Sequence, residues 1–128
     1  MARSQRRSNR KYTGKKYKYF SKKRNRELAR PPIDTEVGPE KTKKERTLGG
    51  NFKLKLFSTP FVNITDPKTK KTEKVKILRY EENPASKELS RRHILTKGAI
   101  IQTEKGLAKI TSRPGQHGMI NAVLLGEE

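Results

Sequence analysis

The chain contains no cysteine and no tryptophan, and only 6% of its 128 residues are aromatic. Without thiolates it can form neither the disulfide framework of a small secreted domain nor a cysteine-liganded zinc ribbon. Apolar residues make up 30%, against about 45–50% in an ordinary packed domain, so we expect a small core or a segment that does not fold alone. No apolar run reaches the roughly 18 residues of a membrane span, and no signal-peptide core is present, so we expect a cytoplasmic protein.

Positive charge is abundant, with 32 Lys and Arg against 13 Asp and Glu and a formal net charge of +19. Charge of this size concerns partners more than fold, because a compact polycation repels itself until a polyanion neutralises it. Nucleic acid is the commonest such partner. An anionic membrane would require a long apolar face beside the basic one, and no stretch of the sequence supplies one.

The uneven charge predicts three domains. Residues 1–30 carry 13 Lys and Arg and one acid, Glu27, and are expected to be a basic RNA-binding arm that is disordered until RNA orders it. A mitochondrial transit peptide shares this composition, but too few aliphatic residues are present for an amphipathic face. Residues 31–50 balance four basic against four acidic residues and are interpreted as a polar linker. Residues 51–128 are expected to be a β-barrel body.

Apolar residues of the body mostly alternate with polar ones, which is the period of a strand with one buried face. Phe52, Leu54 and Leu56 are expected on the core side of a first strand, with Lys53 and Lys55 on the other side.

Further strands are predicted at 61–64, 75–80, 99–103, 107–111 and 119–125, with turns at 66–71, 104–106 and 113–118. Asn83 and Pro84 favour one short helix over about 84–92 that buries Leu89. The predicted fold class is therefore mainly β, a small antiparallel β-barrel with one short helix and a long basic N-terminal extension.

Residues suited to catalysis are few. The only histidines are His93 and His117, and their spacing matches no metal motif. Glu81 and Glu82 are adjacent, so on a strand they point to opposite faces. A nuclease that uses these groups is the enzymatic alternative. We expect no enzyme, no metal and no cofactor.

Three features together indicate RNA binding: a cation-dense arm that neutralises phosphates, tyrosines (Tyr12, Tyr17 and Tyr19) that can stack on bases, and a basic face on the body. DNA stays open on charge alone, although no DNA-binding motif is visible. A nuclear import signal would not explain the tyrosines or the basic strand faces. The predicted RNA-binding residues are Arg3, Arg6, Arg7, Arg10, Lys11, Tyr12, Lys15, Lys16, Tyr17, Lys18, Lys22, Lys23, Arg24, Arg26, Arg30, Arg46, Asn51, Lys53, Lys55, Arg91, Arg92 and Arg113.

Specific strings carry a family resemblance. The longest are residues 96–104 (TKGAIIQTE), 108–116 (AKITSRPGQ) and 121–125 (NAVLL), supported by 49–53 (GGNFK) and 22–31 (KKRNRELARP). In these strings the sequence resembles the small-subunit ribosomal protein S8e family, which archaea and eukaryotes share. It departs from the family at 12–17 (YTGKKY), where a Gly-Gly-Arg element is expected, and this leaves the local contact of Gly14 open.

The resemblance implies a barrel-like body on the small ribosomal subunit, with the arm threaded into ribosomal RNA and other ribosomal proteins as neighbours. It also implies a ribosome-bound, cytoplasmic location, with no cofactor and no turnover. The short length looks like the archaeal form, because eukaryotic members carry a large insertion. We expect no membrane partner, no small-molecule substrate and no homo-oligomer. The alternative is a free-standing RNA-binding or chaperone-like module outside the ribosome.

Overall fold

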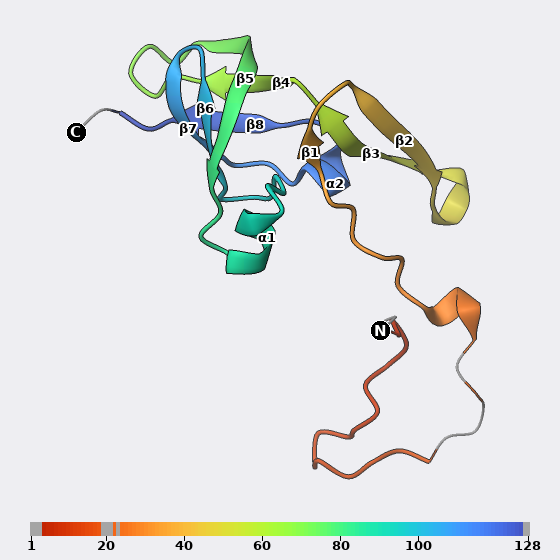
Figure 1. Cartoon of the computed structure of the whole chain (residues 1–128). Coiled ribbons are helices and arrows are strands. Elements are labelled where there is room, and N and C mark those ends of the chain that lie inside the picture. Colours follow the sequence, from red (N-terminus) through yellow and green to blue (C-terminus); the bar gives the residue numbers. More distant parts are fainter. Residues whose placement is uncertain (1–3, 19–21, 23, 127–128) are drawn as a thin grey trace. The chain divides into compact units, whose positions relative to one another are not determined.

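The structure is a computed structural model that describes residues 4–18, 22 and 24–126 (Figure 1). The chain divides into two compact units, Met1–Pro32 and Ile33–Glu128. In the described part of the chain, the first unit contains the short 3-10 turn η1 (Asn25–Glu27), and the second contains the named strands and both α-helices. None of the helices in the described part is long and apolar enough to cross a membrane.

Five strands of the second unit close into a barrel, in the order β4 (Phe61–Thr65), β5 (Thr72–Glu82), β6 (Ile100–Thr103), β7 (Gly106–Ile110) and β8 (Asn121–Leu124). Neighbours in sequence pair antiparallel, whereas β4 and β8 pair parallel. An odd number of alternating strands leaves the first and last pointing the same way, so the closing pair has to be parallel. The predicted barrel is confirmed, but it is not wholly antiparallel.

The barrel interior is filled by the alternating apolar residues of the strands. Val62, Ile64, Val75, Ile77 and Ile101 are all at most 6% exposed, and Lys74 and Lys76 of β5 lie outside. A bulge between Ile77 and Arg79 shifts the alternation of β5, so that Tyr80 also points inward and is 8% exposed. The bulge explains why an odd and an even position of one strand share the core.

A second, three-stranded sheet has the order β1-β3-β2, from β1 (Glu36–Val37), β2 (Lys41–Arg46) and β3 (Phe52–Thr59). The polar-linker interpretation of 31–50 is wrong in its secondary structure, because β1 and β2 lie inside that range. β2 contains no apolar residue, and it is held as a strand by its antiparallel ladder to β3. Thr35 is 1% exposed and donates its hydroxyl to the Leu56 carbonyl at 2.8 Å, so the segment is also anchored to the core.

The short helices differ from the prediction in number and position. α1 (Lys87–Arg91) begins after Ser86 and not at Pro84. The Asn83 side chain is buried; its Nδ2 donates to the Ile94 carbonyl at 3.2 Å and to Thr96 Oγ1 at 2.8 Å, and its Oδ1 accepts from the Ala85 N–H at 3.1 Å. Leu89 is half-buried rather than buried. A second helix, α2 (Pro114–His117), occupies the predicted turn at 113–118, where a proline fits the first helical turn.

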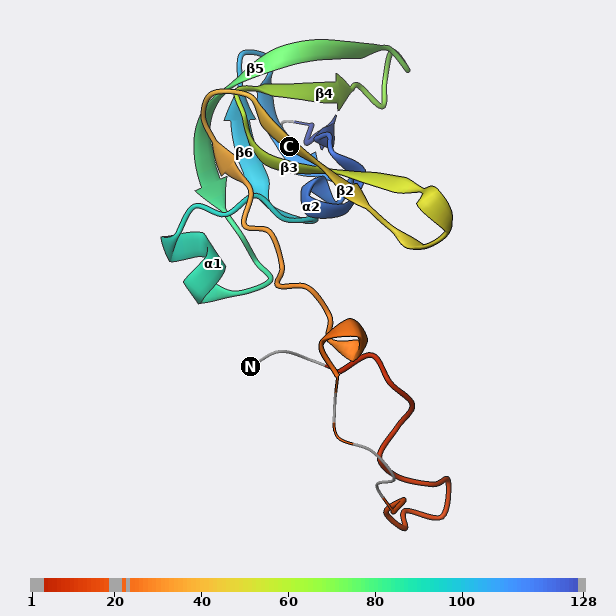
Figure 2. The ribbon, with the colours of Figure 1, turned by 90° about the vertical axis from the view of Figure 1, so that its right-hand side faces the viewer.

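The first strand of the predicted body is exposed over most of its length. Leu56 is in the core, but Phe52 and Leu54 are 57% and 53% exposed. Figure 2 shows why: the outer end of the β2–β3 hairpin, which is closed by the 3-10 turn η2 (Leu48–Gly50), extends beyond the barrel. The alternation correctly predicted that Phe52, Leu54 and Leu56 share one face of the strand, but it did not predict that Phe52 and Leu54 are exposed.

Candidate nucleic-acid interface

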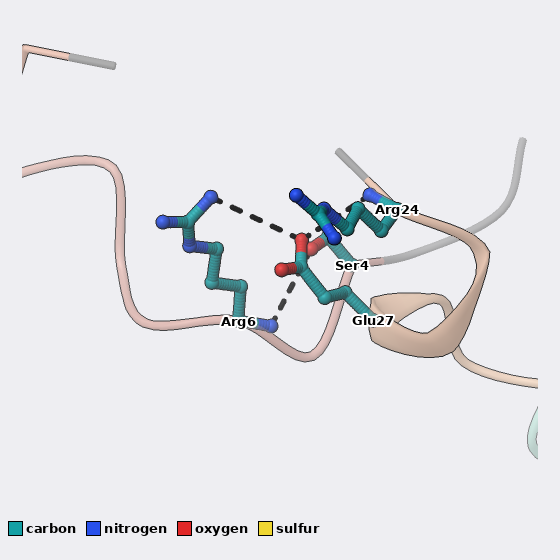
Figure 3. A network of polar contacts seen from close by, with 4 residues as sticks. All are labelled: Ser4, Arg6, Arg24 and Glu27. Carbon is teal, nitrogen blue, oxygen red and sulfur yellow. Dashed lines mark hydrogen bonds and ion pairs between the residues drawn. The ribbon is translucent and has the colours of Figure 1, made fainter. Parts of the chain in front are cut away.

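Glu27 is the only acid of the arm, residues 1–30. Its Oε2 accepts a hydrogen bond from the Arg24 backbone N–H at 3.4 Å and lies 4.0 Å from Nη1 of Arg6. The Arg6 N–H also donates to the Ser4 hydroxyl at 3.4 Å, and Figure 3 shows the Glu27 carboxylate among these groups. A β-bridge joins Ser4 to Leu28. One carboxylate and one bridge thus bring the two ends of the arm side by side.

The middle of the arm forms a turn. An antiparallel bridge joins Arg10 to Lys16, and the Arg10 guanidinium donates from Nη1 to the Gly14 carbonyl at 2.9 Å. Gly14 has φ of +82°, a conformation that favours glycine, and open space around its Cα. Tyr12 lies within this turn and its side chain is fully exposed. The turn therefore presents an exposed aromatic ring.

The two described tyrosines of the arm have different surroundings. The Arg7 guanidinium lies 4.3 Å from the centroid of the Tyr17 ring, and Lys11 Nζ lies 5.4 Å from it. Both distances are within the range of cation–π contacts. The Tyr12 ring is the more open of the two, whereas the Tyr17 ring is flanked by two cations.

Most described cations of the arm have exposed side chains, including Arg7, Arg10 and Lys11, whose partners are given above. Those predicted to bind RNA and found exposed are Arg7, Arg10, Lys11, Lys15, Lys16, Lys18, Lys22, Arg24, Arg26 and Arg30. Arg3, Lys23 and Tyr19 lie outside the described residues.

Four of the predicted residues lie on the β2–β3 hairpin. Arg46 and Lys53 are exposed. The Lys55 ammonium forms an ion pair with Glu45, and these two side chains are only 12% and 16% exposed. Asn51 Nδ2 donates to the Leu48 carbonyl at 3.2 Å, which closes the hairpin turn. Lys55 and Asn51 therefore have structural roles of their own.

The predicted arginines of the body lie at helix ends. Arg91 ends α1 and is exposed, and Arg113 precedes α2 and is exposed. Arg92 follows α1, and its Nη2 lies 2.6 Å from Oδ2 of Asp34. This ion pair ties the segment that enters β1 to the end of α1, so Arg92 has a structural partner in addition to any phosphate.

Sequence reasoning missed the cations of β2, namely Lys41, Lys43 and Lys44. The charges of residues 31–50 balance over the whole segment, and this balance hides them. The signal is present at a shorter scale, since β2 has four Lys and Arg in six residues. Lys44 Nζ lies 4.1 Å from the centroid of the Phe52 ring on the neighbouring strand.

Three of the candidate catalytic groups, His93, His117 and Glu81, are engaged in local structure. His93 has φ of +54° and packs its ring edge-to-face with Tyr80, with centroids 5.1 Å apart. His117 Nδ1 accepts from the Arg113 N–H at 3.4 Å, and Glu81 is in an ion pair with Arg79. Among the residues that the structure describes, no three His, Cys, Asp or Glu side chains gather where they could hold a metal ion.

Comparison with known proteins gives concordant matches over nearly the whole chain. The family model for ribosomal protein S8e matches residues 4–125. The small ribosomal subunit protein eS8 of Nanoarchaeum equitans is 50% identical over 119 residues, which cover 93% of this chain and 94% of that protein. The protein of the same name from Saccharolobus solfataricus is 52% identical over 121 residues, covering 94% and 91%. That of Methanospirillum hungatei is 50% identical over 119 residues, covering 93% and 95%.

Proposed function

The chain belongs to the ribosomal protein S8e family, and from that membership we propose that it is a structural constituent of the small ribosomal subunit that binds ribosomal RNA. The relatives carry the name of a small ribosomal subunit protein, and their organisms are archaea. The proposed location is on cytoplasmic ribosomes, beside other ribosomal proteins, with no catalytic turnover.

The observation that carries the RNA-binding part is the charge of the arm. Thirteen Lys and Arg against one acid in residues 1–30 serve no folding purpose, and like charges at this density repel. The single carboxylate, Glu27, is already used to hold the ends of the arm together. The net charge of the arm therefore requires an external counter-charge, and a folded polynucleotide supplies it densely.

The proposed mechanism is assembly. Exposed arm cations neutralise phosphates, which lowers the repulsion between RNA helices that pack against one another. Tyr12 stacks on an unpaired base, for which its fully exposed ring is suited. Tyr17 positions Arg7 and Lys11 through its ring faces. The exposed cations of the hairpin and of the helix ends add contacts from the body, and the arm orders fully only when RNA is bound.

A charge-neutralising variant tests this proposal in the full-length chain. Lys11, Lys15 and Lys16 are each changed to Gln, and affinity for small-subunit ribosomal RNA is measured over a series of salt concentrations. Each phosphate that is no longer neutralised should reduce the log–log salt slope by about 0.7–0.9, so the slope should fall by about 2–3. Co-sedimentation with assembled subunits should weaken in parallel.

The matched control removes the same charge elsewhere, with Lys68, Lys70 and Lys71 changed to Gln at the exposed turn between β4 and β5. Equal losses in the two variants would show that only net charge matters and would contradict an arm with a specific role. The free-standing alternative is tested with high-salt sucrose gradients, because a module that acts outside the ribosome would leave the subunit peak readily.

A further inference from the structure

The β2–β3 hairpin, residues 41–59, loses its burial progressively toward its tip. Leu56 is 3% exposed where the hairpin joins the core, Leu54 is 53% exposed and Phe52 is 57% exposed. Leu48, in the turn that closes the hairpin, is 95% exposed. Figure 2 shows this outer end reaching past the barrel. Three apolar side chains within seven residues thus face solvent on a projecting element.

The tip of the hairpin, residues 47–51, is a turn that hydrogen bonds close. The Thr47 N–H donates to the Asn51 carbonyl at 2.7 Å, and Asn51 Nδ2 donates to the Leu48 carbonyl at 3.2 Å. Gly49 and Gly50 have φ of +74° and +76°, which lets the chain reverse without strain. The turn therefore holds Leu48 outward before any partner arrives, and ordering it costs little on binding.

The charges around the tip specify the kind of partner. Residues 41–55 carry six Lys and Arg and one acid, Glu45, which is paired with Lys55. Lys44 lies over the Phe52 ring, so a cation and an exposed apolar surface are joined on one face. Two general explanations for such residues exist: lysines on a strand edge prevent aggregation, and single exposed leucines are common on protein surfaces. Neither explanation accounts for a fully exposed leucine that a closed turn presents among cations.

We propose that this tip is a second RNA-binding element, separate from the arm, in which Leu48 packs against an unstacked base or ribose while cations of β2 neutralise the flanking phosphates. The proposal rests on the proposed function, because it takes ribosomal RNA as the partner. RNA fits better than a protein surface, since the density of positive charge would leave most protein partners with unmatched cations. The apolar contact supplies affinity that salt does not screen.

The central test changes Leu48 to Ala in the full-length chain. The matched control is Leu78→Ala, because Leu78 is a leucine on barrel strand β5 that is 58% exposed. Thermal denaturation of both variants checks that the fold is retained, as expected for exposed positions. Affinity for small-subunit ribosomal RNA should fall about tenfold for Leu48→Ala with an unchanged salt slope, and should not change for Leu78→Ala.

A second variant separates apolar from electrostatic contacts. Changing Lys43 and Lys44 to Gln should reduce the salt slope by about 0.7–0.9 for each phosphate that these lysines neutralise, which Leu48→Ala should not do. Chemical probing of the RNA should show at least one base that the wild-type protein protects and the Leu48→Ala variant leaves reactive.

Unchanged RNA affinity and unchanged probing for Leu48→Ala would overturn the inference. If arm variants still weakened binding in that case, the proposed function would stand without it. If Leu48→Ala left RNA affinity intact but released the protein from subunits in high-salt gradients, the tip would contact a neighbouring protein, and its assignment to RNA would be wrong.

Discussion

Gly118 closes α2 at the point where the helix lies against β3, and its replacement by alanine gives the sharpest test of this packing. The residue has φ of +73°, and a Cβ built on it would lie 2.7 Å from Leu54 Cβ and 3.3 Å from the backbone carbon and oxygen of Leu54. These atoms belong to the strand itself and not to the end of a flexible side chain. An added methyl group therefore has to push the helix end away from β3.

The expected loss of stability on Gly118→Ala follows by comparison with Gly50. The φ of Gly50, +76°, nearly equals that of Gly118, but a Cβ added to Gly50 would meet nothing within 4 Å. Left-handed strain of about 1–2 kcal/mol and an opposing gain of about 0.4–1 kcal/mol from a stiffer unfolded chain apply to both variants. The clash applies only to Gly118→Ala and costs about 1–3 kcal/mol. That difference should separate the two free energies of unfolding.

Urea and thermal denaturation of the two full-length variants measure the difference directly. For a unit of about 100 residues, each 1 kcal/mol lowers the melting temperature by about 4–8 °C, so Gly118→Ala should melt at least about 4 °C below Gly50→Ala. Equal stabilities would mean that α2 moves away from β3 without any cost in free energy. In that case the close approach of α2 to β3 would not be a constraint on the fold.

Two further changes test the corners of the second unit. Asn83→Ala should lower the free energy of unfolding by about 2–4 kcal/mol, because it leaves the Ile94 carbonyl and the Ala85 N–H without their partner, and a loss below about 0.5 kcal/mol in urea denaturation would contradict this. The Lys68 backbone N–H and the Thr69 hydroxyl donate to the Asp66 carboxylate and lower the pKa of Asp66 below its ordinary value. The ionised carboxylate therefore stabilises the turn. This contribution is present when the pH is above the ordinary pKa, and it is lost as the pH falls through the lowered pKa. The stability gap between wild type and Asp66→Ala should therefore narrow as the pH falls below the ordinary value of 3.8, and a gap independent of pH would contradict the assignment.

The barrel was predictable because each of its strands has a local signal. Alternation in β4 and β5 set which side chains face the core, and Gly106, the first residue of β7 after the tight turn, adopts φ of +117°. The family resemblance, carried by strings rather than by periodicity, is likewise confirmed. The parallel pairing of β4 with β8 follows from the odd number of strands in the barrel. The segments predicted from the sequence did not determine that number.

Segments without a local signal were misjudged. Residues 41–46 contain no apolar side chain, and they form a strand only because β3 offers a partner for their backbone. The sequence predicts that Asn83 has the local role of a helix cap. Its Oδ1 does accept from the nearby Ala85 N–H, but its Nδ2 also bridges backbone and hydroxyl groups more than ten residues away. Long-range pairing of this kind leaves no periodic trace in the sequence. Composition therefore underestimated how much of residues 33–50 is ordered by pairing with β3.

The candidate site was predictable in its charge but not in its geometry. Counting cations predicts the arm, yet only the structure distinguishes the open ring of Tyr12 from Tyr17, which is flanked by Arg7 and Lys11. At the hairpin, the alternation of Phe52, Leu54 and Leu56 predicts a core strand, and two of these three residues are exposed. Leu54 lies against Gly118 at the end of α2. Phe52 and Leu48, by contrast, are 57% and 95% exposed beyond the core. Apolar residues that alternate as in a core strand but stay exposed are expected to form a binding surface, and the hairpin tip is such a place in this chain.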